Sequence, residues 1–148
     1  MELGDAALDA EHAQLQGHAL RLLHAAAGED GLAALQALQA HAREHFAAED
    51  ADLRRMEGGN ARCHLDEHAN VLRSFEEVGA VLARDVLDAE AKQRLVQRLA
   101  LQLLDWLPEH VREMDAAVAR QRFQARTGGA PVRIARVPAR REERRAVR

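Results

Sequence analysis

The stretch HAREHFAAED, residues 41–50, places His45 and Glu49 four residues apart. Positions i and i+4 share one face of an α-helix. Leu53, four residues after Glu49, and Leu38, seven residues before His45, extend that face. The stretch therefore predicts a helix whose buried face carries ionisable side chains. Because a buried charge is costly unless it is paired or bound to a metal, the rest of the chain must supply partners for these groups.

The composition favours an all-α protein of one domain. The chain has 148 residues, of which 47% are hydrophobic and 30% charged, and it contains three Phe, one Trp and no Tyr. Alanine and leucine dominate, together with Gln, Glu and Arg, which are good helix formers. No run alternates β-branched and polar residues as a strand would.

Four segments show helical periodicity and are separated by short breaks. Their expected ranges are Asp9–Ala27, a second that follows an N-cap at Asp30 and ends near Glu57, Asn60–Arg84, and a fourth from an N-cap at Asp88 to about Arg126. Short connections force neighbouring helices to run antiparallel. The sequence thus predicts an up-down-up-down four-helix bundle over residues 1–126.

Residues 127–148 are expected to form a flexible basic tail. Residues 133–148 carry seven Arg and two Glu, a net charge of +5, whereas the preceding residues carry a net charge of −8. The tail is a candidate contact for an unidentified protein partner. Nucleic-acid binding is disfavoured because the tail lacks aromatic residues and its acids dilute the charge, so a solvated tail is the favoured interpretation.

Two further features indicate a cytoplasmic protein. No apolar run approaches the length of a membrane span, and the N-terminus does not resemble a signal peptide. Cys63 is the only cysteine, which excludes an intrachain disulfide, and an inert thiol is the favoured interpretation.

Ionisable residues occupy the apolar seam of every predicted helix. They are His12, His45, Glu49, His64, His68, His110 and Asp115. Packing alone cannot satisfy so many buried polar groups, so the pattern predicts metal binding. Seven ligands exceed what one zinc ion takes, and mixed imidazole and carboxylate donors favour two iron ions. No His follows a Glu by three residues, which argues against the ferritin-like di-iron arrangement.

These segments resemble the hemerythrin family in its single-domain bacterial branch. The resemblance rests on LDAEH, HFAAED, the pair His64 and His68, and WLPEHVREMD. It implies an oxo- or hydroxo-bridged di-iron centre. His64, His68 and His110 would hold one iron, His12 and His45 the other, and Glu49 and Asp115 would bridge the two. The iron with two histidines would keep an open position at which O2 binds reversibly.

A carrier of O2 needs a dry pocket without oxidisable phenols, and the chain has no tyrosine. The candidates to wall this pocket are Phe46, Trp106, Leu107 and Val111. The alternative interpretation of these four residues is ordinary core packing.

The fourth helix carries two irregular features. Asp115 follows His110 by five residues, which is about 140° around an ideal helix. The spacing predicts a wider, π-like turn between them. Pro108 should bend the helix without changing access to the open iron.

Three histidines remain outside the predicted ligand set. His18 and His24 fall off the seam and are expected to be exposed. His41 is expected on the surface, and the alternative is a supporting contact to a ligand.

Three functions are compatible with this pattern. The leading one is reversible O2 binding for storage, delivery or sensing. The alternative is a di-iron redox enzyme acting on peroxide or nitric oxide. The third is a structural or zinc-binding bundle.

Overall fold

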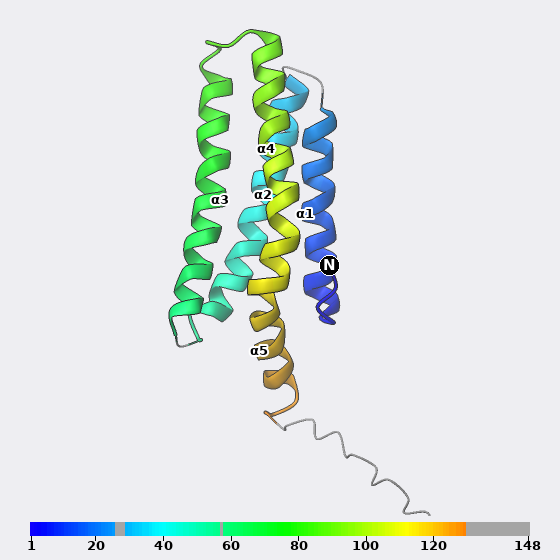
Figure 1. Cartoon of the computed structure of the whole chain (residues 1–148), viewed down its shortest axis with the longest axis vertical. Helices are drawn as coiled ribbons and strands as arrows, with labels where there is room; N and C mark the ends of the chain where they lie inside the picture. Colours follow the sequence, from blue (N-terminus) through cyan, green and yellow to red (C-terminus); the bar gives the residue numbers. More distant parts are fainter. Residues whose placement is uncertain (26–28, 57, 130–148) are drawn as a thin grey trace, which may run out of the picture.

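The computed structural model describes residues 1–25, 29–56 and 58–129. The described elements are α1 (Ala6–His24), α2 (Glu29–Leu53), α3 (Gly59–Ala83), α4 (Ala89–His110), the π-helical turn η1 (Val111–Asp115) and α5 (Ala116–Arg126). Consecutive long helices run in alternating directions, and η1 and α5 continue the line of α4 (Figure 1). The chain is therefore an all-α, up-down-up-down four-helix bundle, as predicted.

The helix ends follow local capping chemistry. Asp88 caps α4, as predicted, because its Oδ1 accepts a hydrogen bond from the Ala91 N–H at 2.7 Å. Asp5 caps α1 in the same way, which starts that helix earlier than its periodicity indicates. The prediction of Asp30 as the cap of α2 is wrong, since the helix already includes Glu29.

The second helix also ends earlier than predicted. It stops at Leu53, and the following residues form tight turns in which the Met56 N–H donates to the Leu53 carbonyl at 3.0 Å. Such i to i−3 bonds are typical of a tightened helix end. The predicted end at Glu57 lies outside the described residues.

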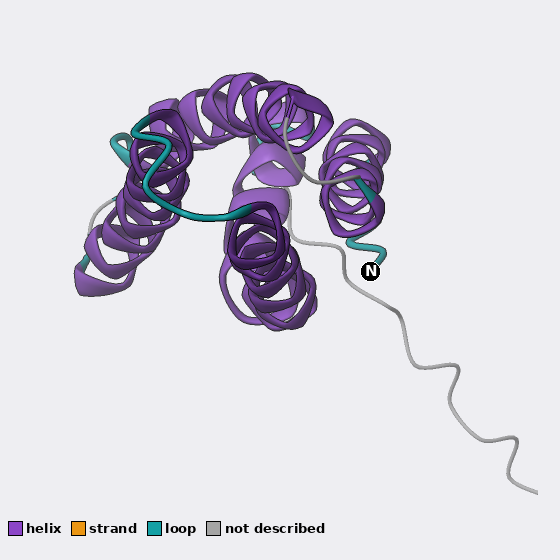
Figure 2. Cartoon of the chain, turned by 90° about the horizontal axis from the view of Figure 1, so that it is seen from above, coloured by secondary structure: helices purple, strands orange, loops and turns teal. Residues whose placement is uncertain are grey.

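Viewed from above, α1 lies beside both α2 and α4, and α3 packs mainly on α2 (Figure 2). The larger apolar cluster fills the bundle towards the α3–α4 connection and includes Leu22, Leu38, Phe75 and Leu99. A smaller cluster fills the opposite end and consists of Leu8, Leu53, Ala61, Val118 and Ala119. Along each helix the predicted ligands lie largely between these two clusters, so apolar packing flanks the site at both ends.

Two ion pairs hold α5 against the other helices. Nη1 of Arg126 lies 2.9 Å from Oδ2 of Asp5, and Nε of Arg122 lies 2.7 Å from Oδ2 of Asp52. Hydrogen bonding to Arg126 is the main influence that holds the pKa of Asp5 below its usual range, against an opposing effect of burial. These pairs tie the segment that follows Asp115 to the start of α1 and to α2.

Within the described residues, no helix is long and apolar enough to cross a membrane. Of the predicted tail, Thr127–Gly129 form a turn after α5, and residues 130–148 lie outside the described part of the chain.

Candidate metal centre

The structure brings all seven predicted ligands together inside the bundle. Each is at most 4% exposed, and they come from α1, α2, α3, α4 and η1. Their ligand atoms fall into two groups. One is Glu49, His64, His68, His110 and Asp115, and the other is His12, His45, Glu49 and Asp115.

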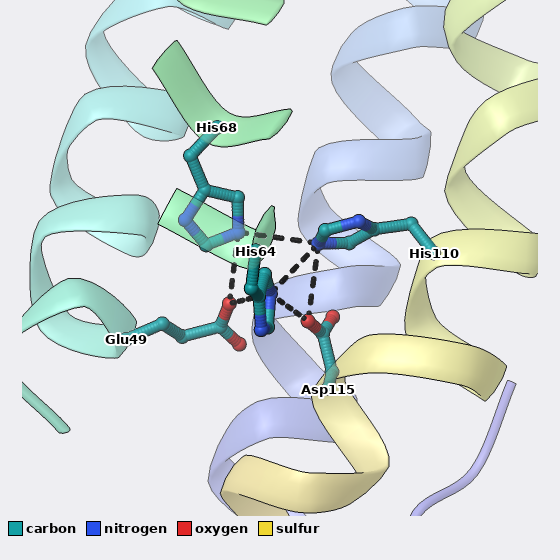
Figure 3. A group of neighbouring side chains, drawn as sticks. All are labelled: Glu49, His64, His68, His110 and Asp115. Carbon is teal, nitrogen blue, oxygen red and sulfur yellow. Dashed lines mark hydrogen bonds and ion pairs between the residues drawn. The ribbon is translucent and has the colours of Figure 1, made fainter. Parts of the chain in front are cut away.

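Three imidazoles converge in the first group (Figure 3). Nε2 of His110 lies 3.1 Å from Nε2 of His64 and 3.1 Å from Nε2 of His68. Two donors bound at right angles to a first-row metal ion, each about 2.1 Å from it, are about 3 Å apart. The spacing of the three nitrogens therefore fits neighbouring positions around one ion.

The second group contains two imidazoles. Nε2 of His12 lies 2.9 Å from Oδ2 of Asp115 and 3.7 Å from Oε1 of Glu49. Nε2 of His45 lies 3.7 Å from the same Glu49 oxygen. This group thus presents two nitrogens and two carboxylate oxygens, one nitrogen fewer than the first.

The two carboxylates join the groups through different oxygens. Asp115 directs Oδ1 to His64 at 2.8 Å and Oδ2 to His12. Glu49 directs Oε2 to His68 at 3.4 Å and Oε1 to His12 and His45. A carboxylate that divides its oxygens in this way is placed to bridge two ions.

Bound metal ions would satisfy the polar atoms of the site better than hydrogen bonds among its own imidazoles and carboxylates do. Among the described residues, both nitrogens of His12 and all four oxygens of Glu49 and Asp115 are buried without a well-directed hydrogen bond. Buried polar atoms are normally paired, and each exception needs an explanation. Imidazole and carboxylate donors are ligands that first-row metals accept, so two bound ions would satisfy these atoms.

The π-helical turn η1 confirms the irregularity predicted between His110 and Asp115. Its wider turn brings Oδ1 of Asp115 to 3.1 Å from Nε2 of His110. Pro108 lies inside α4 just before this turn, and its predicted lack of effect on access to the site stays a prediction.

Two supporting carboxylates were missed by the sequence analysis. Asp50 lies 2.7 Å from Nδ1 of His68, and Glu67 lies 2.7 Å from Nδ1 of His110. A carboxylate at Nδ1 keeps the proton there and turns the lone pair of Nε2 towards a metal. Asp50 follows Glu49 and Glu67 precedes His68, and this adjacency is the one sign of their role that the sequence contains.

The pKa shifts reflect the same crowding. Burial opposes protonation of His12, but polar contacts with Asp115 and Glu49 outweigh it and raise its pKa to about 9. Burial opposes ionisation of Glu49, yet contacts with His12 and His68 lower its pKa to about 2. The pKa of Asp115 lies far below its usual range, because contacts with His110, His12 and His64 outweigh its burial.

Burial is the largest influence on His45 and lowers its pKa. Burial also acts to lower the pKa of His68, but contacts with Glu49 and then Asp50 outweigh it, so that pKa is raised. Without metal, the site is therefore a set of ionised carboxylates that attract protons onto some imidazoles.

Two of the four residues predicted to wall an O2 pocket contact candidate ligands. Phe46 stacks on His68, with ring centroids 4.1 Å apart, and Trp106 stacks on His110 at the same separation. Nε1 of Trp106 also donates to Glu67 at 3.2 Å. Phe46, Leu107 and Val111 are buried core residues. These contacts put both aromatic rings beside the three-imidazole group, and the pocket role itself stays a prediction.

Two of the three remaining histidines are not exposed as predicted. His24 is exposed, but His18 is half-buried and its ring centroid lies 5.1 Å from that of His41. The side chain of His41 is only 12% exposed and its ring stacks parallel to His45 at 6.3 Å. The two imidazoles contact each other across α1 and α2, which the apolar seam alone does not indicate. Cys63 is exposed and unpaired.

Comparison with known proteins agrees with this geometry. Residues 3–121 match the family model described as the hemerythrin HHE cation binding domain. The chain is 37% identical over 118 residues to a bacteriohemerythrin of Ralstonia nicotianae, a match that covers 78% of this chain and 79% of that protein. No solved structure matches the chain significantly.

Proposed function

Because this chain belongs to the hemerythrin family, we propose that it binds O2 reversibly at a non-heme di-iron centre. The observation that carries the proposal is the division of the oxygens of Glu49 and Asp115 between the two imidazole groups. His64, His68 and His110 would hold one iron and His12 and His45 the other. When bound, two reduced irons would supply the electrons that hold O2, and the iron with two imidazoles would have the open position.

The protein's own residues would then do three things. Asp50 and Glu67 hold the rings of His68 and His110 with Nε2 facing the site. Glu49 and Asp115 supply two negative charges against the charge of the metal ions. The apolar clusters flank the site at both ends and limit its contact with water.

The composition supports binding over turnover. The chain contains no tyrosine, so no phenol can donate a hydrogen atom to bound oxygen.

We propose residues 1–126 as the metal-binding bundle and residues 127–148 as an appendage to it. The family match ends at residue 121, before the proposed appendage.

Metal content and the visible spectrum test this function together. The spectrum is measured after reduction with dithionite and again after exposure to air. Two irons per chain and an oxy spectrum that bleaches when O2 is removed would support reversible binding. Two irons that pass directly to the oxidised spectrum would favour reduction of peroxide or nitric oxide. Zinc, or no metal, would contradict both functions.

A further inference from the structure

A cleft of about 320 Å³ lies beside the three-imidazole group, between the end of α2, the start of α3 and the η1–α5 segment. Its exposed residues include Asn60, Cys63 and Glu113. Its buried residues are Leu53, Ala61 and His64. The cleft therefore leads from the surface to one of the buried candidate ligands.

His64 differs from the other two imidazoles of its group. His68 and His110 are each held at Nδ1 by a carboxylate. All the polar contacts of His64 with described residues run through Nε2. Its ring has no anchor of that kind, so it can turn out of the group at a lower cost than the other two.

The size of the cleft suits a hydrated metal ion. The cleft of about 320 Å³ gives a hydrated ion more room than the other opening at the three-imidazole group. The opening beside His110 has a volume of only about 100 Å³. Size therefore favours the cleft at His64 as the route for a hydrated ion.

The lining of the cleft offers no strong binding site for a cation. Glu113 contributes a carboxylate, Arg120 contributes a guanidinium that offsets its charge, and Met56, Cys63 and Met114 contribute sulfur atoms. Neutral thioether and thiol sulfurs are weak donors, and a single carboxylate retains an ion poorly. Such a lining can contact a cation without retaining it.

We propose that metal ions enter and leave the centre through this cleft, and that His64 is the ligand that opens to exchange them. The inference rests on the proposed metal binding. It adds a route and an order of events, in which His64 releases its ion before His68 and His110 do.

The single cysteine allows the route to be blocked chemically. Metal-free protein is labelled at Cys63 with a bulky maleimide, and anaerobic uptake of Co2+, a probe that does not oxidise readily, is followed by its absorption. The loss of Co2+ to an excess of chelator is measured on the loaded protein. Labelling should slow both rates by about tenfold or more, because exchange must then wait for local opening of the packed helices. The final Co2+ content should not change.

A matched control places the same label elsewhere on α3. Ala80→Cys in a Cys63→Ser background puts an exposed thiol about 25 Å further along the helix. Labelling there should leave both rates unchanged, and Cys63→Ser alone should do the same because the thiol is not a required ligand. Ala117→Phe narrows the cleft from the opposite wall without a label and should slow exchange as well.

The outcomes separate this inference from the proposed function. Equal rates with and without the label at Cys63, at the full Co2+ content, would overturn the route alone. Equal slowing by the label on the Ala80→Cys control would overturn it too. If none of these proteins bound Co2+, both the route and the metal centre would be contradicted.

Discussion

Nε2 of His110 lies 3.1 Å from Oδ1 of Asp115, although five residues separate the two positions. In a regular α-helix this spacing would turn the side chains about 140° apart. In the π-helical turn η1 the backbone bonds run from i to i+5, so five residues complete about one turn. The π-helical turn thus takes up one extra residue and so puts both side chains on one face of the last long helix.

Deleting that extra residue should preserve the centre. Arg112 is 71% exposed and makes only surface contacts, with Glu109 and Glu113. Without it, Asp115 would follow His110 by four residues, which a regular α-helix places on one face. We expect the variant that lacks Arg112 to bind as much metal as the unaltered chain. The amide hydrogens between His110 and Asp115 should then exchange as they do in a regular α-helix.

An insertion supplies the opposite case. One Ala added after Arg112 would separate His110 and Asp115 by six residues, beyond the reach of either helix type. Metal content measured by mass spectrometry should fall in the insertion variant only. Loss of metal from the deletion variant would show that η1 does more than align Asp115 with His110.

The carboxylates behind the ligands should control metal affinity. Asp50→Asn and Glu67→Gln each remove the charge that holds an imidazole through Nδ1. We expect each change to weaken metal binding by about 10–100-fold, measured by competition with a chelator. Asp66→Asn, at an exposed position of the same helix as Glu67, is the matched control. If Asp66→Asn weakened metal binding equally, the loss of affinity would come from the change in surface charge and not from the contact with an imidazole.

The sequence was sufficient to predict which seven candidate ligands come together, but not which residues surround them. His12, His45 and Glu49 lie in a seam with apolar neighbours, and that period reports directly which helix face is buried. Asp50, Glu67 and His41 lie on the flanks of their helices. Whether a flank faces a neighbouring helix or solvent depends on how the helices are rotated and crossed, which one seam does not specify. The start of α2 was missed because Asp30 has the chemistry of a cap but lies inside the helix.

The metal-free protein should be most stable near pH 6.5. The pKa of His12 is raised from 6.5 to about 9, so its contribution is complete below pH 6.5 and is lost as the pH rises through about 9. The pKa of Glu49 is lowered from 4.5 to about 2, so its contribution is present above pH 4.5 and is lost as the pH falls through about 2. His45, whose pKa is lowered, destabilises the fold below 6.5. His68, whose pKa is raised, adds to the loss of stability above pH 6.5.

Urea unfolding of the metal-free protein between pH 4 and 9 measures this dependence. Above pH 6.5, His12→Gln should flatten the decline, which amounts to at most about 1.4 kcal/mol per pH unit for each proton involved. His24→Gln, at an exposed site, should leave the decline unchanged. A decline of the same steepness in both variants would place the titration elsewhere in the protein.

The two imidazole groups should differ in how they lose metal. Among the described residues, the ion pair of His45 is with Oε1 of Glu49, the oxygen that faces the two-imidazole group. His45→Ala therefore leaves that group with one nitrogen while His64, His68 and His110 keep theirs. We expect His45→Ala to retain about one ion of two and to lose the oxy spectrum, because the proposed open position is on the ion that would be lost. Metal content and absorption measured on one sample would check both results. His24→Ala should retain two ions. A His45→Ala protein that kept both ions and the oxy spectrum would show that the open position lies on the three-imidazole side, where Phe46 and Trp106 stack on the ligands.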